Sequence, residues 1–180
     1  MKKIELRSHR IFLENIIFLV SLLIAYILQT SCNFFNIFGV TPLIILAVML
    51  SISMFYGVTT TCVYSFISGI LCDICLDIPV GISCLIFVIT FMTINMLTIY
   101  YFRINIVSFL LFMFILILIE SLTVAIFRSS EASSFQMNVY VIKNIIPLII
   151  VTEIMSIPIF LFFKFINKKV FLRSDIFYTK

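Results

Sequence analysis

The sequence has very little charge. Only 11% of its 180 residues are Asp, Glu, Lys or Arg, whereas 63% are hydrophobic. A soluble domain carries about 25% charged residues, so this chain could not cover its own surface in water. Its mean hydropathy of +1.29 fits lipid as the solvent instead. The composition therefore excludes a soluble globular protein and predicts an integral membrane protein with a single domain over residues 1–180.

Histidine and glycine are also scarce, with one and four residues respectively. The single histidine, His9, precedes the first apolar segment, which excludes histidine-based metal sites and Ser–His chemistry inside the membrane. Cys72 and Cys75 form a lone CxxC in an apolar run, which is weak support for a metal or redox site. Asp73 and Asp77 lie on one helix, not on two facing helices as an intramembrane aspartyl protease would need. We therefore expect no catalytic residue, metal or cofactor.

Six apolar segments are long enough to be considered as membrane spans. Because every backbone polar group must be paired inside a bilayer, and because these segments lack strand-like alternation, we expect them to be helices. The predicted spans are residues 11–30, 40–55, 58–76, 82–102, 104–127 and 139–166.

The second of these spans is short for a hydrocarbon core about 30 Å thick. Its start is marked by Pro42, which suits a first helical turn, and its end by Gly57. The distribution of basic residues along the chain supports counting this segment as a span. With six spans, ten of the twelve Lys and Arg residues fall on the side of both termini, as the positive-inside rule requires. We therefore predict six transmembrane helices with both termini in the cytoplasm of a bacterium.

Most basic residues gather at the two chain ends, which contributes to the net charge of +4. This placement fits anionic lipid headgroups better than a nucleic-acid-binding stripe. We therefore expect lipid contact at the termini and no nucleic-acid partner.

Five charged residues within the predicted spans are candidate functional residues: Glu14, Asp73, Glu120, Lys143 and Glu153. Such residues are costly in a membrane and often mark functional sites. Asp73, Glu120 and Lys143 all fall in the outer half of the bilayer, where Lys143 could pair with either acid. Glu153 lies deeper, on a different face of its helix from Lys143. Two interpretations remain open: polar contacts between helices, which we favour, or a ligand or ion pathway.

The most patterned stretch runs from Gly57 to Gly81. Four of its residues recur every four positions and so share one helix face: Ser65, Gly69, Asp73 and Asp77. Ser65 and Gly69 form a small-xxx-small pair that lets a neighbouring helix approach closely. Pro79 and Gly81 then predict a short outward turn into the next helix.

This stretch resembles the rod shape-determining protein MreD family, whose members are small bacterial inner-membrane proteins with a G-[LI]-L-x-D motif. The core of the motif matches Gly69 to Asp73, the upstream aromatic matches Phe66, and the turn matches Pro79 and Gly81. Pro42 fits the proline that opens the second helix. The resemblance implies a six-helix fold like that of the substrate-binding subunits of energy-coupling-factor vitamin transporters.

The resemblance also implies a function: a non-catalytic scaffold of the machinery that elongates the cell wall. The implied partners are MreC, the actin-like MreB, a glycan polymerase and a penicillin-binding transpeptidase. On this hypothesis Asp73 and the small-residue face fix the helix bundle, and an outer groove receives a partner's transmembrane helix. Replacing Gly69 by leucine would then weaken partner association without preventing insertion.

Two other functions compete with this one. The first is a vitamin-binding transporter subunit, but that family presents a row of alanines on its first helix. Here the corresponding segment has Ala25 alone. The second is a membrane enzyme acting on lipid-linked precursors, which the lack of paired catalytic groups disfavours.

Overall fold

The computed structural model describes residues 2–31, 40–76, 78–102, 104–131 and 144–169. Within these ranges the chain is all-helical, as the sequence predicts. Six helices are described, and their bounds are α1 (Lys2–Thr30), α2 (Ile44–Phe55), α3 (Val58–Leu76), α4 (Ile82–Tyr100), α5 (Ile106–Glu131) and α7 (Ile146–Lys169).

Four of the described helices, α3, α4, α5 and α7, are long and apolar enough to cross a membrane. Their outward faces also carry large apolar side chains, among them Phe66, Leu85 and Val107. Such side chains suit contact with lipid and not with water. Together with the composition, these four helices indicate a multi-pass membrane protein.

The two remaining helices, α1 and α2, have apolar parts that are shorter than those four. The apolar part of α1, Glu14–Thr30, is shorter than the four spans, although its helix continues back to Lys2. Helix α2 has 12 residues, which extend over roughly 18 Å at 1.5 Å per residue. It begins at Ile44, so Pro42 precedes the helix instead of occupying its first turn.

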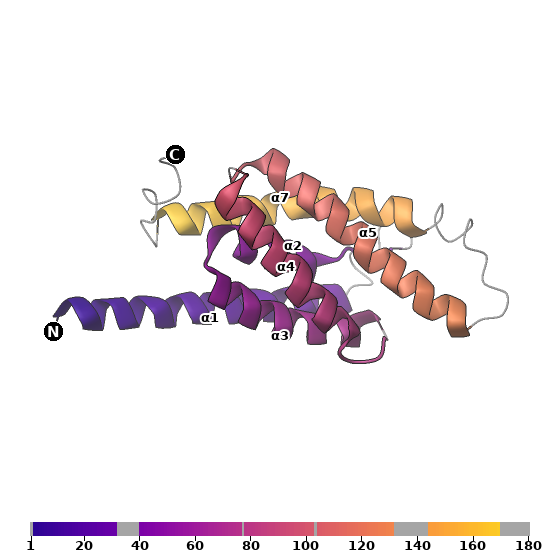
Figure 1. The fold of residues 1–180 in the computed structure, drawn as a ribbon, viewed down its shortest axis with the longest axis horizontal. Helices are drawn as coiled ribbons and strands as arrows, with labels where there is room; N and C mark the ends of the chain where they lie inside the picture. The colour runs from indigo at the N-terminus through magenta and orange to yellow at the C-terminus, as the bar shows by residue number, and fades with distance from the viewer. Residues whose placement is uncertain (1, 32–39, 77, 103, 132–143, 170–180) are drawn as a thin grey trace.

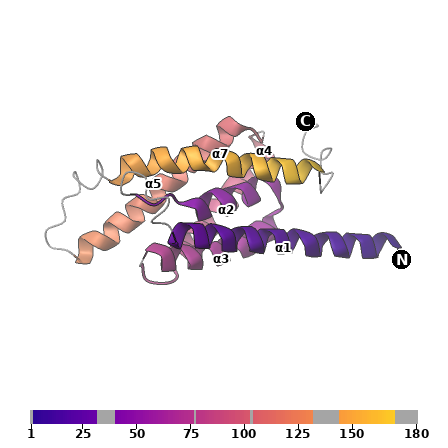
Figure 2. The same ribbon diagram turned by 180° about the vertical axis from the view of Figure 1, so that it is seen from behind.

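The helices run back and forth between two ends of the bundle. Lys2, the start of α1, and Lys169, the end of α7, lie at the same end in both Figure 1 and Figure 2. The turn between α3 and α4, the end of α5 and the start of α7 lie at the opposite end. We call this opposite end the turn end of the bundle.

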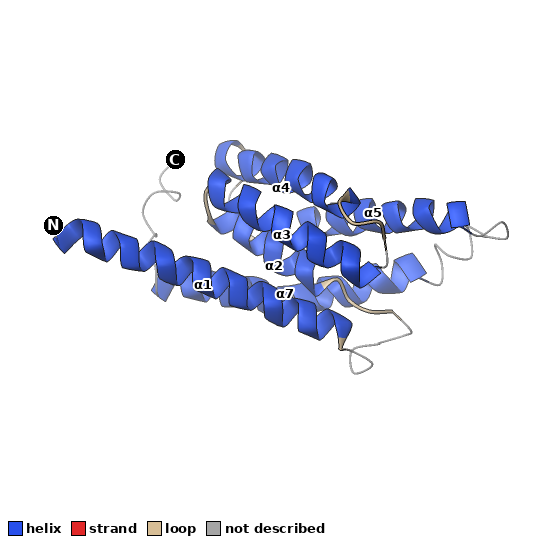
Figure 3. Cartoon of the chain, turned by 90° about the horizontal axis from the view of Figure 1, so that it is seen from below, coloured by secondary structure: helices blue, strands red, loops and turns tan. Residues whose placement is uncertain are grey.

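Helix α2 forms the centre of the bundle. All its residues are buried, and it packs against each of the other five described helices. Viewed from below, α3 lies between α1 and α4 (Figure 3), and it contacts both of them. A helix enclosed in this way must have its end groups paired inside the protein, because neither water nor lipid reaches them.

Side chains of neighbouring helices pair the ends of α2. At its start, the Ile45 amide donates to the Gln29 side-chain oxygen (3.2 Å) and the Leu43 amide donates to the Thr152 hydroxyl (3.3 Å). At its end, the Asn95 amide group donates to the carbonyl oxygens of Ser53 and Tyr56. These bonds hold α1, α4 and α7 around the central helix.

Aromatic rings fill much of the space around α2. Phe160 of α7 lies between Phe55 of α2 and Phe109 of α5, at ring-centroid distances of 5.6 and 4.7 Å. Phe18 of α1 meets Tyr56 edge-on at 4.4 Å. Lipid is as apolar as these rings, so close packing and interhelical hydrogen bonds are what favour this core over lipid contact.

Candidate functional site: the polar pocket at the turn end

Asp73 is fully buried near the end of α3, and its carboxylate holds the start of α4. One oxygen accepts a hydrogen bond from the Gly81 amide (2.6 Å) and the other accepts one from the Ser83 amide (2.9 Å). Amides at a helix N-terminus lack partners within the helix and favour a negative charge. Asp73 therefore caps α4 from another helix and fixes the α3–α4 turn.

The turn itself depends on Gly81. Its φ of 113° lies in the left-handed region, which glycine adopts at little cost and other residues rarely adopt. Pro79 sits on the exposed surface of the turn. Both residues thus lie in the turn between α3 and α4, where the sequence predicts a hairpin. Asp77 lies outside the described residues.

Gly69 lies where the backbones of α3 and α4 come close together. A Cβ atom built on Gly69 would overlap the Cα of Cys84 in α4 and would lie 2.8 Å from its backbone nitrogen. Ser65, one turn earlier, is also fully buried. The small residues of this face therefore serve a contact between two helices of the same chain. This contact is one through which the small-residue face could fix the helix bundle, and the effect of Gly69→Leu on partner association stays a prediction.

Glu120 of α5 joins the same network and is 1% exposed. Its Oε1 accepts a hydrogen bond from the Ser83 hydroxyl (2.8 Å) and one from the Cys72 thiol (3.6 Å). Ser83 thus bridges two acids, with its amide on Asp73 and its hydroxyl on Glu120. The other oxygen of Glu120, Oε2, is buried and has no hydrogen-bond partner in the described part of the chain.

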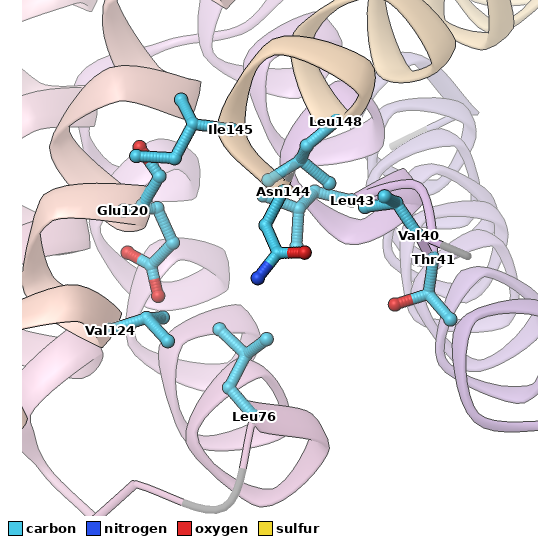
Figure 4. A pocket seen from close by; sticks show the side chains of 10 residues that line it. Val40, Thr41, Leu43, Leu76, Glu120, Val124, Asn144, Ile145 and Leu148 are labelled. Carbon is cyan, nitrogen blue, oxygen red and sulfur yellow. The ribbon is translucent and has the colours of Figure 1, made fainter. Parts of the chain in front are cut away.

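A cavity of about 210 Å³ lies beside Glu120 at the turn end. We call it the polar pocket. It is lined by Val40, Thr41, Leu43, Leu76, Glu120, Ser121, Val124, Asn144, Ile145 and Leu148. Figure 4 shows the Glu120 carboxylate, the Asn144 amide and the Thr41 hydroxyl facing the same space, with Leu76 below them. The pocket therefore combines apolar walls with polar side chains from three parts of the chain.

Of the other predicted intramembrane charges, the structure places Glu153, which is partly buried on α7, away from the polar pocket lining. Lys143 lies outside the described residues, so its pairing with Asp73 or Glu120 stays a prediction. No group of three or more metal-ligating side chains occurs among the residues that the structure describes.

Several polar residues of these networks were not predicted as site residues. Ser83, Asn95, Asn144, Thr41 and Gln29 each donate, accept or line the pocket. One signal was available in the sequence: Asn95 is the only strongly polar amide inside the apolar run 82–102. Serine and threonine give no such signal, because both can satisfy their hydroxyls on their own helix.

No protein-family model, curated protein or solved structure matches this chain.

Proposed function

We propose that this chain is a non-catalytic scaffold of the bacterial cell-wall elongation machinery, located in the cytoplasmic membrane and related in role to MreD. The observation that carries the proposal is that the motif residues join α3 to α4. Both carboxylate oxygens of Asp73 accept hydrogen bonds from backbone amides at the start of α4, and Gly69 allows the two helices to pack closely. These residues build a rigid hairpin, which suits a scaffold that presents fixed surfaces to partner proteins.

The proposed orientation places both termini and the end of α7 in the cytoplasm, and the turn end outside. Two observations support it. The start of α1 and the end of α7 share one end of the bundle, and most of the basic residues of the sequence belong to that end. Basic residues are enriched on the cytoplasmic side of bacterial membrane proteins. The six predicted spans include α2, which would cross together with the residues before it.

We place the partner's transmembrane helix in an apolar groove between α1 and α7. This apolar groove has a volume of about 380 Å³ and is lined by Ser21, Ile24, Ala25, Leu28, Ile44, Val48, Met155, Pro158, Ile159, Phe162 and Phe163. Ser21 and Ala25 are four residues apart, so small side chains share one face of α1 there. Small residues at this spacing let a second helix come close, and Ser21 is the one of the two that is still partly exposed, because Ala25 is buried in the core. MreC is the partner that we expect to supply that helix.

Replacing Ile24 by tryptophan is expected to weaken this association. Ile24 lines the groove and is 51% exposed, so a larger ring would fill the space of the incoming helix. The matched control is Leu23→Trp, on the same helix and 45% exposed, but outside the groove. We expect MreC recovery with the tagged Ile24→Trp chain to fall about tenfold, equivalent to about 1.4 kcal/mol.

The measurement is co-purification of MreC with each tagged variant from detergent extracts of cells that express both proteins. Recovery of MreC with the Leu23→Trp chain should match that with the unaltered chain. Equal recovery with both variants would place the partner elsewhere, and no recovery with the unaltered chain would contradict the scaffold proposal itself.

A further inference from the structure

Helix α7 carries one acid, Glu153, within its membrane-spanning part, which runs from Ile146 to Asn167. Glu153 follows Ile146 by seven residues, which places it about 10 Å along the helix axis from the start of the span. Asn167 lies a further 14 residues away, or about 21 Å. An acid at this depth is costly unless it is paired, and such acids often mark functional sites. The question is therefore what pairs with Glu153.

The described part of the chain does not supply a partner for the Glu153 carboxylate, which makes no hydrogen bond or ion pair there. The Ser156 hydroxyl donates to the backbone carbonyl of Glu153 (2.8 Å) and not to its side chain. The Thr152 hydroxyl accepts a backbone amide at the start of α2. Lys164 lies 11 residues further along the helix, or about 16 Å, and its ammonium is 6.0 Å from the centre of the Phe160 ring. The acid is thus left for a group from outside.

Glu153 lies at the edge where α7 leaves its contact with α5. Seven residues separate it from Phe160, so the two side chains share one helix face. The Phe160 ring lies 4.7 Å from the Phe109 ring of α5, centroid to centroid. Towards the other side, Ile150 and Ile154 are 54% and 63% exposed, and Glu153 itself is partly exposed. We call this strip the acidic edge, and it consists of Ile146, Ile150, Glu153 and Ile157.

The depth and the chemistry of the acidic edge select the kind of group that can pair with Glu153. A carboxylate out of water is stabilised by a cation. A metal ion would need more ligands, and the described residues hold no group of three or more metal-ligating side chains. Lipid headgroups lie about 10 Å away along the helix axis. Another transmembrane helix can bring a basic side chain to this depth, because its own backbone is already paired.

We propose that the acidic edge binds a transmembrane helix of another protein, and that a lysine or arginine of this helix pairs with Glu153. Ile150 and Ile157 lie about one turn on either side of the acid and contact apolar residues that flank the cation. The acidic edge shares no residue with the apolar groove, so a helix in each can be bound at once. The proposal does not rest on the scaffold function, because its evidence is Glu153 and the residues around it.

The test uses two synthetic transmembrane peptides of leucine and alanine. One carries a single lysine about 10 Å from one end of its apolar run, and the other carries methionine at that position. Each labelled peptide is titrated against the labelled full chain in phosphatidylcholine vesicles, and association is measured by fluorescence energy transfer. We expect the chain to bind the lysine peptide about tenfold more tightly than the methionine peptide. Glu153→Gln should remove this difference and keep the thermal unfolding midpoint of the unaltered chain.

A double variant, Glu153→Gln with Ile154→Glu, distinguishes a site from a general attraction between charges in lipid. It moves the acid by one position, at nearly the same depth, to a side chain that is 63% exposed. We expect this variant to bind both peptides equally. Preference for the lysine peptide in the double variant, or no preference in the unaltered chain, overturns the proposal. Energy transfer between two labelled copies of the chain that Glu153→Gln abolishes also overturns it, because a second copy would then cover the acidic edge.

Discussion

Replacing Gly69 by leucine is expected to lower the thermal unfolding midpoint of the detergent-solubilised protein by about 6–12 °C. The reason is the backbone of α4: any Cβ at Gly69 would overlap the Cα of Cys84. A backbone atom cannot move aside as a flexible side chain can, so α3 and α4 must separate. Overpacking of this kind costs about 3 kcal/mol, and a chain of this size loses about 2–4 °C per kcal/mol.

Gly57 supplies the matched control for this substitution. A Cβ at Gly57 would meet nothing within 4 Å, and only Gly81 has a positive φ among the described glycines. Gly57→Leu should therefore keep the midpoint of the unaltered chain to within a few degrees. The two variants are compared by thermal unfolding in the same detergent, with a thiol-reactive dye as the reporter. Equal midpoints for both variants would show that α3 and α4 are not in backbone contact at Gly69.

Replacing Asp73 by alanine is expected to have an effect of similar size. The substitution leaves the Gly81 and Ser83 amides without acceptors inside the protein. A buried donor that loses its partner costs about 1–3 kcal/mol; the Ser83 amide is buried and the Gly81 amide partly buried, so the loss is about 3 kcal/mol for the pair. The α3–α4 turn should then open, and the link from Ser83 to Glu120 should weaken with it.

Asp73→Asn gives an intermediate result that tests the geometry. The asparagine side chain keeps one acceptor oxygen but presents an amide group in place of the second, so about half of the stability loss is expected. The order of midpoints should be unaltered chain, Asp73→Asn, Asp73→Ala. The control is Glu153→Ala, which removes a partly buried acid on α7 that is not part of the α3–α4 turn and is expected to change the midpoint little. An Asp73→Ala protein as stable as the unaltered chain would contradict the capping role of Asp73.

The helices could be predicted from the sequence because lipid demands long apolar runs with internally paired backbones. The run of residues 58–76, for example, coincides with α3. Bounds were less well predicted where a helix continues into a polar segment. Helix α1 extends back to Lys2, and α5 reaches Glu131, because a helix can pass the edge of its apolar run without losing its backbone bonds.

The candidate site could also be predicted only in part. The small residues and Asp73 could be placed together from sequence, since a spacing of four puts them on one helix face. The helix that these residues contact could not be predicted, because the sequence does not say which helix lies opposite them. The link from Ser83 to Glu120 joins residues 37 positions apart in the chain. Such contacts depend on the tertiary packing of α4 against α5, which no local pattern encodes.

The short central helix was the hardest element to interpret from sequence. Its 12 residues look like an incomplete span, and only the structure explains how it is accommodated. Gln29, Thr152 and Asn95 pair its ends from α1, α7 and α4. These residues are polar exceptions in apolar runs, and their partners lie between 16 and 109 positions away.

The scaffold proposal is tested most directly by isolating the tagged chain from its native membranes in a mild detergent and identifying its companions by mass spectrometry. Our account predicts that MreC and the wall-synthesis enzymes accompany it. Recovery of a pair of ATPases with a membrane coupling subunit, or of a tightly bound vitamin, would contradict the account and identify a transporter subunit instead.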